Sequence, residues 1–370
     1  MIRSSFVWML AICVVMVLYN TANNVINDRG FQIMSRVVLI RANIDDSLLA
    51  QLKQISADLT IERVSARSDE QISDDLWKRV EVLYGFPWML PKPEQVPNLK
   101  WVQLYSAGAD RLLTNPLFKT QVMFTTASGV HAIVIAEYVF TMIQTWYRNL
   151  PQMLAWQREH HWPSRQEEQS LHNEELFGKT IGIVGYGSIG RHAARIASGY
   201  GMRVLAMQHS TNHRDSGFVF PNVGDPEGTL PERYYTFDQL HEMLHECDIV
   251  VIGVPLTNET RRMFDESAFQ AMKNSAFLVN IARGEVCDEA ALIRALQTKQ
   301  IAGAALDVFE QEPLPAESPL WDMPNVFITP HISGINPQYN ERAAAIFETN
   351  LRRYLKGEPL LNLVEKERGY

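Results

Sequence analysis

The chain has 370 residues, enough for two domains that each bury a core of their own. Its 46% hydrophobic and 21% charged residues are typical of a globular protein, and its net charge of −8 argues against nucleic acid as a partner because no basic stripe could neutralise phosphates. Cys13, Cys247 and Cys287 give neither a disulfide framework nor a metal-ligand spacing, which predicts a cytoplasmic protein without a metal site.

Residues 1–34 are predicted to be an extension that precedes the first domain. The apolar run at 6–19 follows Arg3 and would span roughly 21 Å as a helix, short of the ~30 Å membrane core. Three interpretations stay open: a dispensable extension or misplaced start, a membrane anchor through residues 6–19, or a cleaved signal peptide with a poor cleavage site at 20–22. We expect a chain that starts at Met34 to fold and to be active.

Short apolar runs separated by amphipathic stretches predict strands at 37–40, 80–84, 101–104 and 122–124. These spacers suit helical crossovers between the strands of a parallel sheet. An apolar stripe then predicts a helix over 131–150, and the polar segment 157–173 is predicted to be an interdomain linker.

The segment Gly185-Tyr186-Gly187-Ser188-Ile189-Gly190 lies between a predicted buried strand, 180–184, and the predicted start of a helix, 191–197. In this context the G-x-G-x-x-G spacing indicates a dinucleotide-binding loop. Its glycines allow a tight turn, close approach of a pyrophosphate and close packing of helix on strand. The free N–H groups of the new helix then hold the phosphates. We therefore predict that Gly185, Gly187, Ser188, Ile189 and Gly190 bind a dinucleotide.

Further strands are predicted at 202–207, 248–253, 276–281 and 301–306, which gives a doubly wound sheet. The segment 210–235 is long for a connection and rich in Asn, Asp, Gly and Pro, so we expect a surface insertion near the cofactor. A predicted helix at 337–355 could return to complete the first domain. The predicted division is 35–150 plus 332–370 for a discontinuous substrate domain and 151–331 for the dinucleotide-binding domain.

Three ionisable residues recur late in the chain: Arg283 and Glu312 each follow a predicted strand, and His331 lies in the segment 328–334. Because ligand sites of open α/β sheets form outside the carboxyl ends of the strands, all three can converge there. An arginine fork suits a carboxylate or keto oxygen, and a histidine oriented by a carboxylate suits proton transfer near neutral pH. The set suits the reduction of a 2-keto acid or the oxidation of a 2-hydroxy acid.

These motifs resemble those of the D-isomer-specific 2-hydroxyacid dehydrogenase family over about residues 37–362. The resemblance depends on the loop 185–190, Pro255-Leu256-Thr257 with Thr260, 280–285 with Asp288-Glu289, 307–314 and 329–334. It implies a Rossmann-type nucleotide domain inserted in a flavodoxin-like substrate domain, both with doubly wound parallel sheets. It also implies a homodimer.

The resemblance also implies roles for single residues. His331 would be the acid/base, Glu312 its partner, and Arg283 the arginine that binds the substrate. Backbone N–H groups of Ala107 and Gly108 would hold the substrate carboxylate. The cofactor would be lined by Pro255, Thr257 and Asp307, and Gly129 and Val130 would form a small-residue turn beside the cleft.

Dinucleotide folds that prefer NAD carry an acidic residue about 20 residues past the glycines, where it binds the ribose 2′-OH. The strand 202–207 is followed here by Gln208 and His209, with Arg214 further on. No carboxylate repels a 2′-phosphate at Gln208, and Arg214 and His209 could attract one. NADP is therefore favoured, with NAD as the alternative.

Two functions are compatible with these residues. The first is an NAD(P)-dependent reductase of the glyoxylate and hydroxypyruvate type, in which hydride comes from the nicotinamide and His331 supplies the proton. The second is an NAD(H)-sensing, corepressor-like binding protein, because relatives of the family use the same fold as a binding module. Turnover of NADPH with glyoxylate or hydroxypyruvate would distinguish the two.

Overall fold

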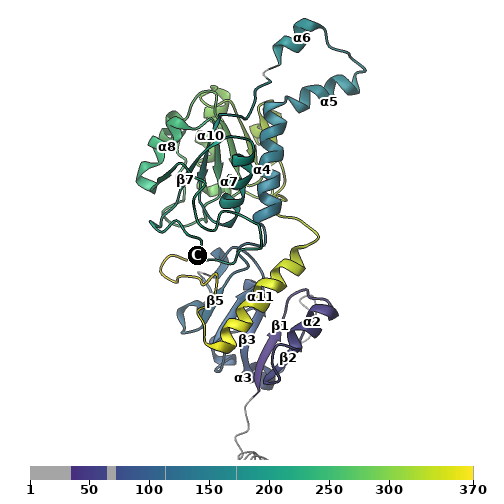
Figure 1. Cartoon of the computed structure of the whole chain (residues 1–370), viewed down its shortest axis with the longest axis vertical. Helices are drawn as coiled ribbons and strands as arrows, with labels where there is room; N and C mark the ends of the chain where they lie inside the picture. The colour runs from purple at the N-terminus through teal and green to yellow at the C-terminus, as the bar shows by residue number, and fades with distance from the viewer. Residues whose placement is uncertain (1–34, 65–71, 113, 172, 370) are drawn as a thin grey trace, which may run out of the picture.

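The computed structural model describes residues 35–64, 72–112, 114–171 and 173–369. Over these residues the chain forms two parallel sheets with helices on their faces, one below the other in Figure 1. This confirms the predicted α/β class. The predicted extension and its apolar run at 6–19 lie outside the described residues, and no described helix is long and apolar enough to cross a membrane.

The lower sheet has five parallel strands in the order β2-β1-β3-β4-β5, the flavodoxin-like order. The four predicted strands form close to their expected bounds. The strand β2 was not predicted because it lies at the edge, with only Ile61 buried and charged residues at its end. The elements are β1 (Arg36–Ile40), α2 (Asp46–Lys53), β2 (Leu59–Arg63), α3 (Asp74–Arg79), β3 (Val80–Gly85), β4 (Trp101–Leu104) and β5 (Met123–Thr125).

The last helix, α11 (Tyr339–Lys356), returns to this sheet, as predicted (Figure 1). Phe347 is fully buried and stacks on Tyr84 of β3 with ring centroids 4.4 Å apart. Beyond the helix, Leu363 forms an antiparallel bridge to Thr125 at the end of β5. The first and last parts of the chain therefore share one core, and the seven-stranded sheet is inserted between them.

The upper sheet has seven parallel strands in the order β12-β11-β10-β9-β6-β7-β8. The chain starts at β6, builds outwards through β7 and β8, and then crosses to β9 on the other side. The change of direction between β6 and β9 is the switch point at which doubly wound sheets bind nucleotides. The strands are β6 (Thr180–Val184), β7 (Arg203–Met207), β8 (Arg233–Tyr235), β9 (Ile249–Ile252), β10 (Phe277–Asn280), β11 (Gly303–Leu306) and β12 (Val326–Ile328). The helices are α7 (Ser188–Gly199), α8 (Leu240–Glu246), α9 (Glu266–Ala271) and α10 (Glu289–Gln297).

The helix α4 (Ala132–Tyr147) packs with the seven-stranded sheet, in contrast to the predicted division at residue 150. Val139 and Ile143 are fully buried in the same core as Ile181, and Trp146 stacks on Phe277 at 4.9 Å. The apolar stripe of α4 predicted a buried face, but a stripe alone cannot tell which of two sheets covers it.

The segment 157–173, predicted to be an interdomain linker, lies between α4 and β6, which pack in one core. Two helices form here: α5 (Leu150–Arg158), which ends at the start of this segment, and α6 (Arg165–Ser170), which lies within it. Together they project from the body of the protein as an arm, residues 150–170 (Figure 1).

Candidate active site

The glycine loop connects β6 to α7 at the switch point. Gly185 has a φ of 105°, and a Cβ there would lie 2.7 Å from the backbone carbonyl carbon of Gly253. A Cβ on Gly190 would collide with the carbonyl oxygen of Gly185, whereas the space around Gly187 is open. Among the described residues no side chain caps the start of α7, so the N–H groups of Ser188 and Ile189 are available to an anionic ligand. This arrangement fits the pyrophosphate of NAD(P).

At the carboxyl end of β7, Gln208 stabilises the turn that follows it. Its side-chain amide donates to the carbonyls of Ser210 and Asn212, at 2.5 and 3.1 Å. Nε2 of His209 lies 3.7 Å from the carboxylate of Glu259. Arg214 pairs with Glu227, and its Nε donates to that carboxylate at 2.9 Å. The three residues predicted to select the cofactor thus lie in one turn, and both basic side chains have exposed carboxylate partners.

The segment after β9 forms a tight turn closed by the hydroxyl of Thr260. This hydroxyl donates to the carbonyl of Pro255 at 2.6 Å and accepts from the backbone N–H of Thr257 at 2.9 Å. The turn fixes the backbone of the predicted cofactor-lining residues Pro255 and Thr257 next to the switch point.

His331 and Glu312 form a hydrogen-bonded pair, with Nδ1 of the ring 2.8 Å from Oε2 of the carboxylate. The other oxygen, Oε1, accepts from the backbone N–H of Phe309 at 3.2 Å. The side chain of His331 is 48% exposed. Its φ of 55° is in the left-handed region, which is strained for a residue with a side chain and is common at functional sites.

Asp307, which follows β11, holds the segment that carries His331. Its carboxylate accepts three hydrogen bonds: from the Thr329 hydroxyl at 2.6 Å and from the backbone N–H groups of Ile332 and Ser333 at 2.9 and 3.0 Å. The carboxylate is fully buried, so these donors stabilise its charge. The resemblance implied that Asp307 lines the cofactor, and the structure adds that Asp307 fixes the His331 segment.

Arg283 follows β10, the strand next to β11, and its Nη1 donates to the carbonyl of Ala282 at 2.8 Å. The next residue, Gly284, lies against the backbone of Phe309, the residue that orients Glu312. The carboxyl ends of β10, β11 and β12 therefore bring Arg283, Glu312 and His331 to the same edge of the sheet.

Ala107 and Gly108 lie beyond the carboxyl end of β4, in the five-stranded sheet. The hydroxyl of Tyr339 donates to the carbonyl of Tyr105 at 2.7 Å, and the hydroxyl of Tyr105 donates to Asn340. The start of α11 thus fixes the backbone immediately before the predicted carboxylate-binding loop.

His131 is a residue of this region that the sequence did not indicate. Its ring packs on Tyr339, with centroids 5.1 Å apart, and on Gly334, where a Cβ would lie 2.8 Å from the imidazole. Burial lowers the pKa of His131 to about 4, and the nearby guanidinium groups of Arg283 and Arg342 act in the same direction. His131 therefore connects the His331 segment with the substrate domain as a neutral ring.

Within the described ranges, no group of three or more His, Cys, Asp or Glu side chains is placed to hold a metal ion.

Comparisons with known proteins agree with this fold. A family model described as "D-isomer specific 2-hydroxyacid dehydrogenase, NAD binding domain" matches residues 140–333. A protein named glyoxylate reductase from Korarchaeum cryptofilum is 33% identical over 324 residues, which cover 83% of this chain and 93% of the relative.

Two solved structures share the whole architecture. A D-isomer specific 2-hydroxyacid dehydrogenase family protein from Aeromonas salmonicida is 31% identical, with a TM-score of 0.70 over 90% of this chain and 99% of its own. A D-isomer specific 2-hydroxyacid dehydrogenase from Xanthobacter autotrophicus, in complex with NADPH and MES, is 29% identical, with a TM-score of 0.73 over 91% of this chain and all of its own.

Proposed function

The chain belongs to the D-isomer-specific 2-hydroxyacid dehydrogenase family, and we propose that it reduces glyoxylate and hydroxypyruvate with NADPH. It is an NAD(P)-dependent oxidoreductase that interconverts 2-keto acids and D-2-hydroxy acids. The choice of a small keto acid is supported by the relative from Korarchaeum cryptofilum, which is named for glyoxylate.

The observation that carries the proposal is the contact of 2.8 Å between His331 and Glu312 at the same sheet edge as the glycine loop. Because Nδ1 of His331 is hydrogen-bonded to the carboxylate of Glu312, Nε2 is the ring nitrogen that can protonate the keto oxygen. A dinucleotide held at the glycine loop would supply the hydride from its dihydronicotinamide ring. The guanidinium of Arg283 binds the substrate carboxylate and polarises the keto group, and the N–H groups of Ala107 and Gly108 bind the carboxylate from the other domain.

The preference for NADPH is proposed from the turn after β7. Gln208 stands where an acidic residue would select NAD, and its amide is engaged with the carbonyls of its own turn. His209 and Arg214 are exposed, and each has a carboxylate partner that a 2′-phosphate can replace. The similar protein from Xanthobacter autotrophicus, which holds NADPH, supports the same choice.

A steady-state assay of the purified protein tests both parts of the proposal. We expect oxidation of NADPH that depends on glyoxylate or hydroxypyruvate, and a higher kcat/KM with NADPH than with NADH. Larger 2-keto acids, such as 2-oxobutyrate and phenylpyruvate, complete the panel. NADPH binding without turnover of any keto acid in the panel would contradict the proposed enzyme and favour a cofactor-sensing protein.

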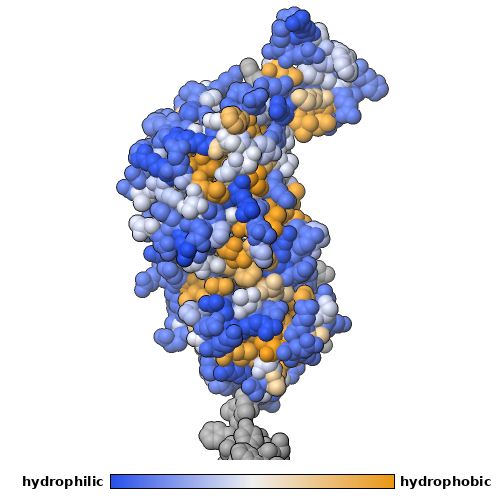
Figure 2. Space-filling model, viewed as in Figure 1, coloured by the Kyte–Doolittle hydropathy of each residue, from blue (hydrophilic) through white to orange (hydrophobic). Residues whose placement is uncertain are grey.

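The arm supports a homodimer as the working form of the enzyme. Leu150, Met153 and Leu154 of α5 are exposed apolar residues, and Trp162 beyond it is 90% exposed. Figure 2 shows hydrophobic residues where the arm leaves the body of the protein. Exposed apolar side chains on a projecting element are typical of a surface that a second copy covers. Light scattering should give a dimer for the wild type, and Leu154→Asp should shift the mass towards the monomer.

A further inference from the structure

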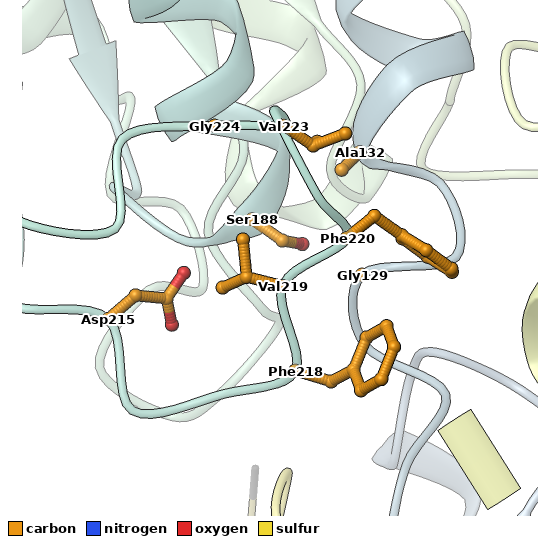
Figure 3. A pocket seen from close by; sticks show the side chains of 9 residues that line it. All are labelled: Gly129, Ala132, Ser188, Asp215, Phe218, Val219, Phe220, Val223 and Gly224. Atoms are coloured by element: carbon orange, nitrogen blue, oxygen red, sulfur yellow. The ribbon is translucent and has the colours of Figure 1, made fainter. Parts of the chain in front are cut away.

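The connection between β7 and β8 contains a segment that reaches both domains. Residues 215–224, here named the strap, contain neither helix nor strand and run from the side of α7 towards the substrate domain (Figure 3). A segment without regular hydrogen bonding needs specific contacts to hold one conformation. The strap has such contacts with both domains.

On the dinucleotide-binding side the strap is held by Arg191, in the second turn of α7. The side chain of Arg191 is 5% exposed, and its guanidinium donates to the carbonyls of Asp225 and His213, at 2.7 and 2.8 Å. Its Nε lies 3.4 Å from the carboxylate of Asp215. A buried guanidinium is stable only with such partners. Because these partners flank or begin the strap, Arg191 fixes both ends of it against α7.

On the substrate-domain side the strap is held by Asn362, in the segment that follows α11. The Asn362 side-chain oxygen accepts from the backbone N–H of Phe218 at 2.9 Å. Its amide group donates to the carbonyls of Thr126 and Ser128, at 3.2 and 2.9 Å. One side chain therefore connects the strap, the loop after β5 and the end of the chain.

Gly129 allows the strap to come this close to the loop that leads into α4. It has a φ of 101°, and a Cβ there would lie 2.9 Å from the carbonyl oxygen of Phe218. Any side chain would be strained at this φ and would press against the strap.

The strap also lies beside the proposed cofactor site. Together with Gly129 and Ala132, its residues Phe218, Val219 and Phe220 line a small pocket, which Ser188, the first residue of α7, also lines (Figure 3). The pocket has a volume of about 10 Å³, which is barely enough space to hold one water molecule. Since dinucleotide folds place the pyrophosphate at this helix N-terminus, the strap lies beside the proposed pyrophosphate position.

We propose that the strap closes the pyrophosphate side of the NAD(P)H site, and that Arg191 and Asn362 are the positioning residues that hold it closed. The inference rests on the proposed function only in placing NAD(P)H at the glycine loop. Release of the cofactor then requires the contact between Phe218 and Asn362 to open, so Asn362 controls the rate at which the cofactor leaves.

The test is the dissociation rate of NADPH from Asn362→Gly, measured by stopped-flow fluorescence after addition of excess NADP. Glycine suits this position because Asn362 has a φ of 57°, where other side chains would add strain. Asn149→Gly is the matched control, because Asn149 also has a positive φ, 49°, and lies at the start of the arm. We expect dissociation about tenfold faster for Asn362→Gly, which corresponds to about 1.4 kcal/mol, and an unchanged rate for the control. An unchanged rate in folded Asn362→Gly would overturn the proposal.

Hydrogen–deuterium exchange of the wild-type protein provides a second test that needs no variant. We expect the amides of residues 215–224 to exchange more slowly when NADPH is bound, and equal exchange in both states would overturn the proposal. The failures of the two proposals are distinguishable. If neither NADPH nor NADH binds to the wild type, the proposed function fails. If NADPH binds but its dissociation is insensitive to Asn362, only the role of the strap fails.

Discussion

Nδ1 of His331 lies 2.8 Å from Oε2 of Glu312, and the same carboxylate accepts a backbone hydrogen bond from Phe309. The backbone thus orients the carboxylate, and the carboxylate orients the ring. His331 has a φ of 55° and its segment is bound to the buried carboxylate of Asp307, so the ring has few ways to turn away. The whole arrangement is built from three neighbouring strand ends of one parallel sheet.

Glu312→Gln is expected to lower kcat for glyoxylate reduction by about 10- to 100-fold, because the neutral amide orients the ring but does not stabilise its protonated form. His331→Ala should cost at least about a hundredfold, the usual weight of general acid catalysis. Steady-state kinetics with saturating NADPH give both values. A Glu312→Gln enzyme with wild-type kcat would show that the carboxylate does not assist the proton donor.

Arg283→Ala is expected to abolish keto-acid reduction while NADPH still binds, because the substrate carboxylate loses its planar partner. Arg283→Lys should also be poor, since a lysine ammonium cannot donate two parallel hydrogen bonds to a carboxylate. The two readouts are turnover of glyoxylate and NADPH binding by fluorescence titration. Near-native turnover in the alanine variant would contradict the assignment.

The parts of the fold that could be predicted are those with a strong local signal. The buried strands β1, β6 and β10 are mostly apolar runs. The structure gives a steric reason for the predicted glycines at 185 and 190, where a Cβ would collide with the backbone, whereas the space around Gly187 is open. The edge strands β8 and β12 have three residues each, too short to give a periodic pattern.

What could not be predicted depends on contacts between residues distant in the chain. His131 looks like an ordinary residue at the start of a helix, and its meaning comes from packing on Gly334 and Tyr339. In the sequence Arg191 resembles an exposed helix arginine. In the structure it is buried, because the strap and the residues that flank it, from His213 to Asp225, cover it. The sequence did contain a signal for a structured turn at Asp225, because the cluster Gly224-Asp225-Pro226 is typical of one. In the structure the hydroxyl of Tyr186 donates to the carboxylate of Asp225 at 2.8 Å.

Gln208→Asp is expected to shift cofactor preference from NADPH towards NADH. A carboxylate at the end of β7 would repel the 2′-phosphate and accept from the ribose hydroxyls of NADH. The measurement is kcat/KM for both cofactors with one keto acid. Glu227→Gln is the variant expected to act in the opposite direction, because it removes the carboxylate partner of Arg214. We expect that variant to improve the KM for NADPH. A wild-type enzyme that prefers NADH tenfold or more would contradict the interpretation of this turn.

Acid sensitivity should depend on His131. Burial lowers its pKa to about 4 in the folded protein, whereas an unfolded chain has the ordinary histidine value of about 6.5. Between these two values the unfolded state binds the proton and the folded state does not. The free energy of unfolding therefore falls as the pH decreases through this range, by about 2 kcal/mol between pH 7.5 and pH 5. Urea denaturation of the wild type and of His131→Asn at both pH values measures this contribution.

We expect His131→Asn to be less stable at pH 7.5, because the ring fills the space between Gly334 and Tyr339. The informative quantity is the difference between the two pH values, which should be smaller in the variant by about 2 kcal/mol. His245→Asn is the matched control, since His245 is exposed at the end of α8 and the same substitution there should leave the difference unchanged. If wild type and His131→Asn lose equal stability on acidification, His131 is accessible to protons in the folded protein. The ring would then not be the buried connection between the His331 segment and the substrate domain.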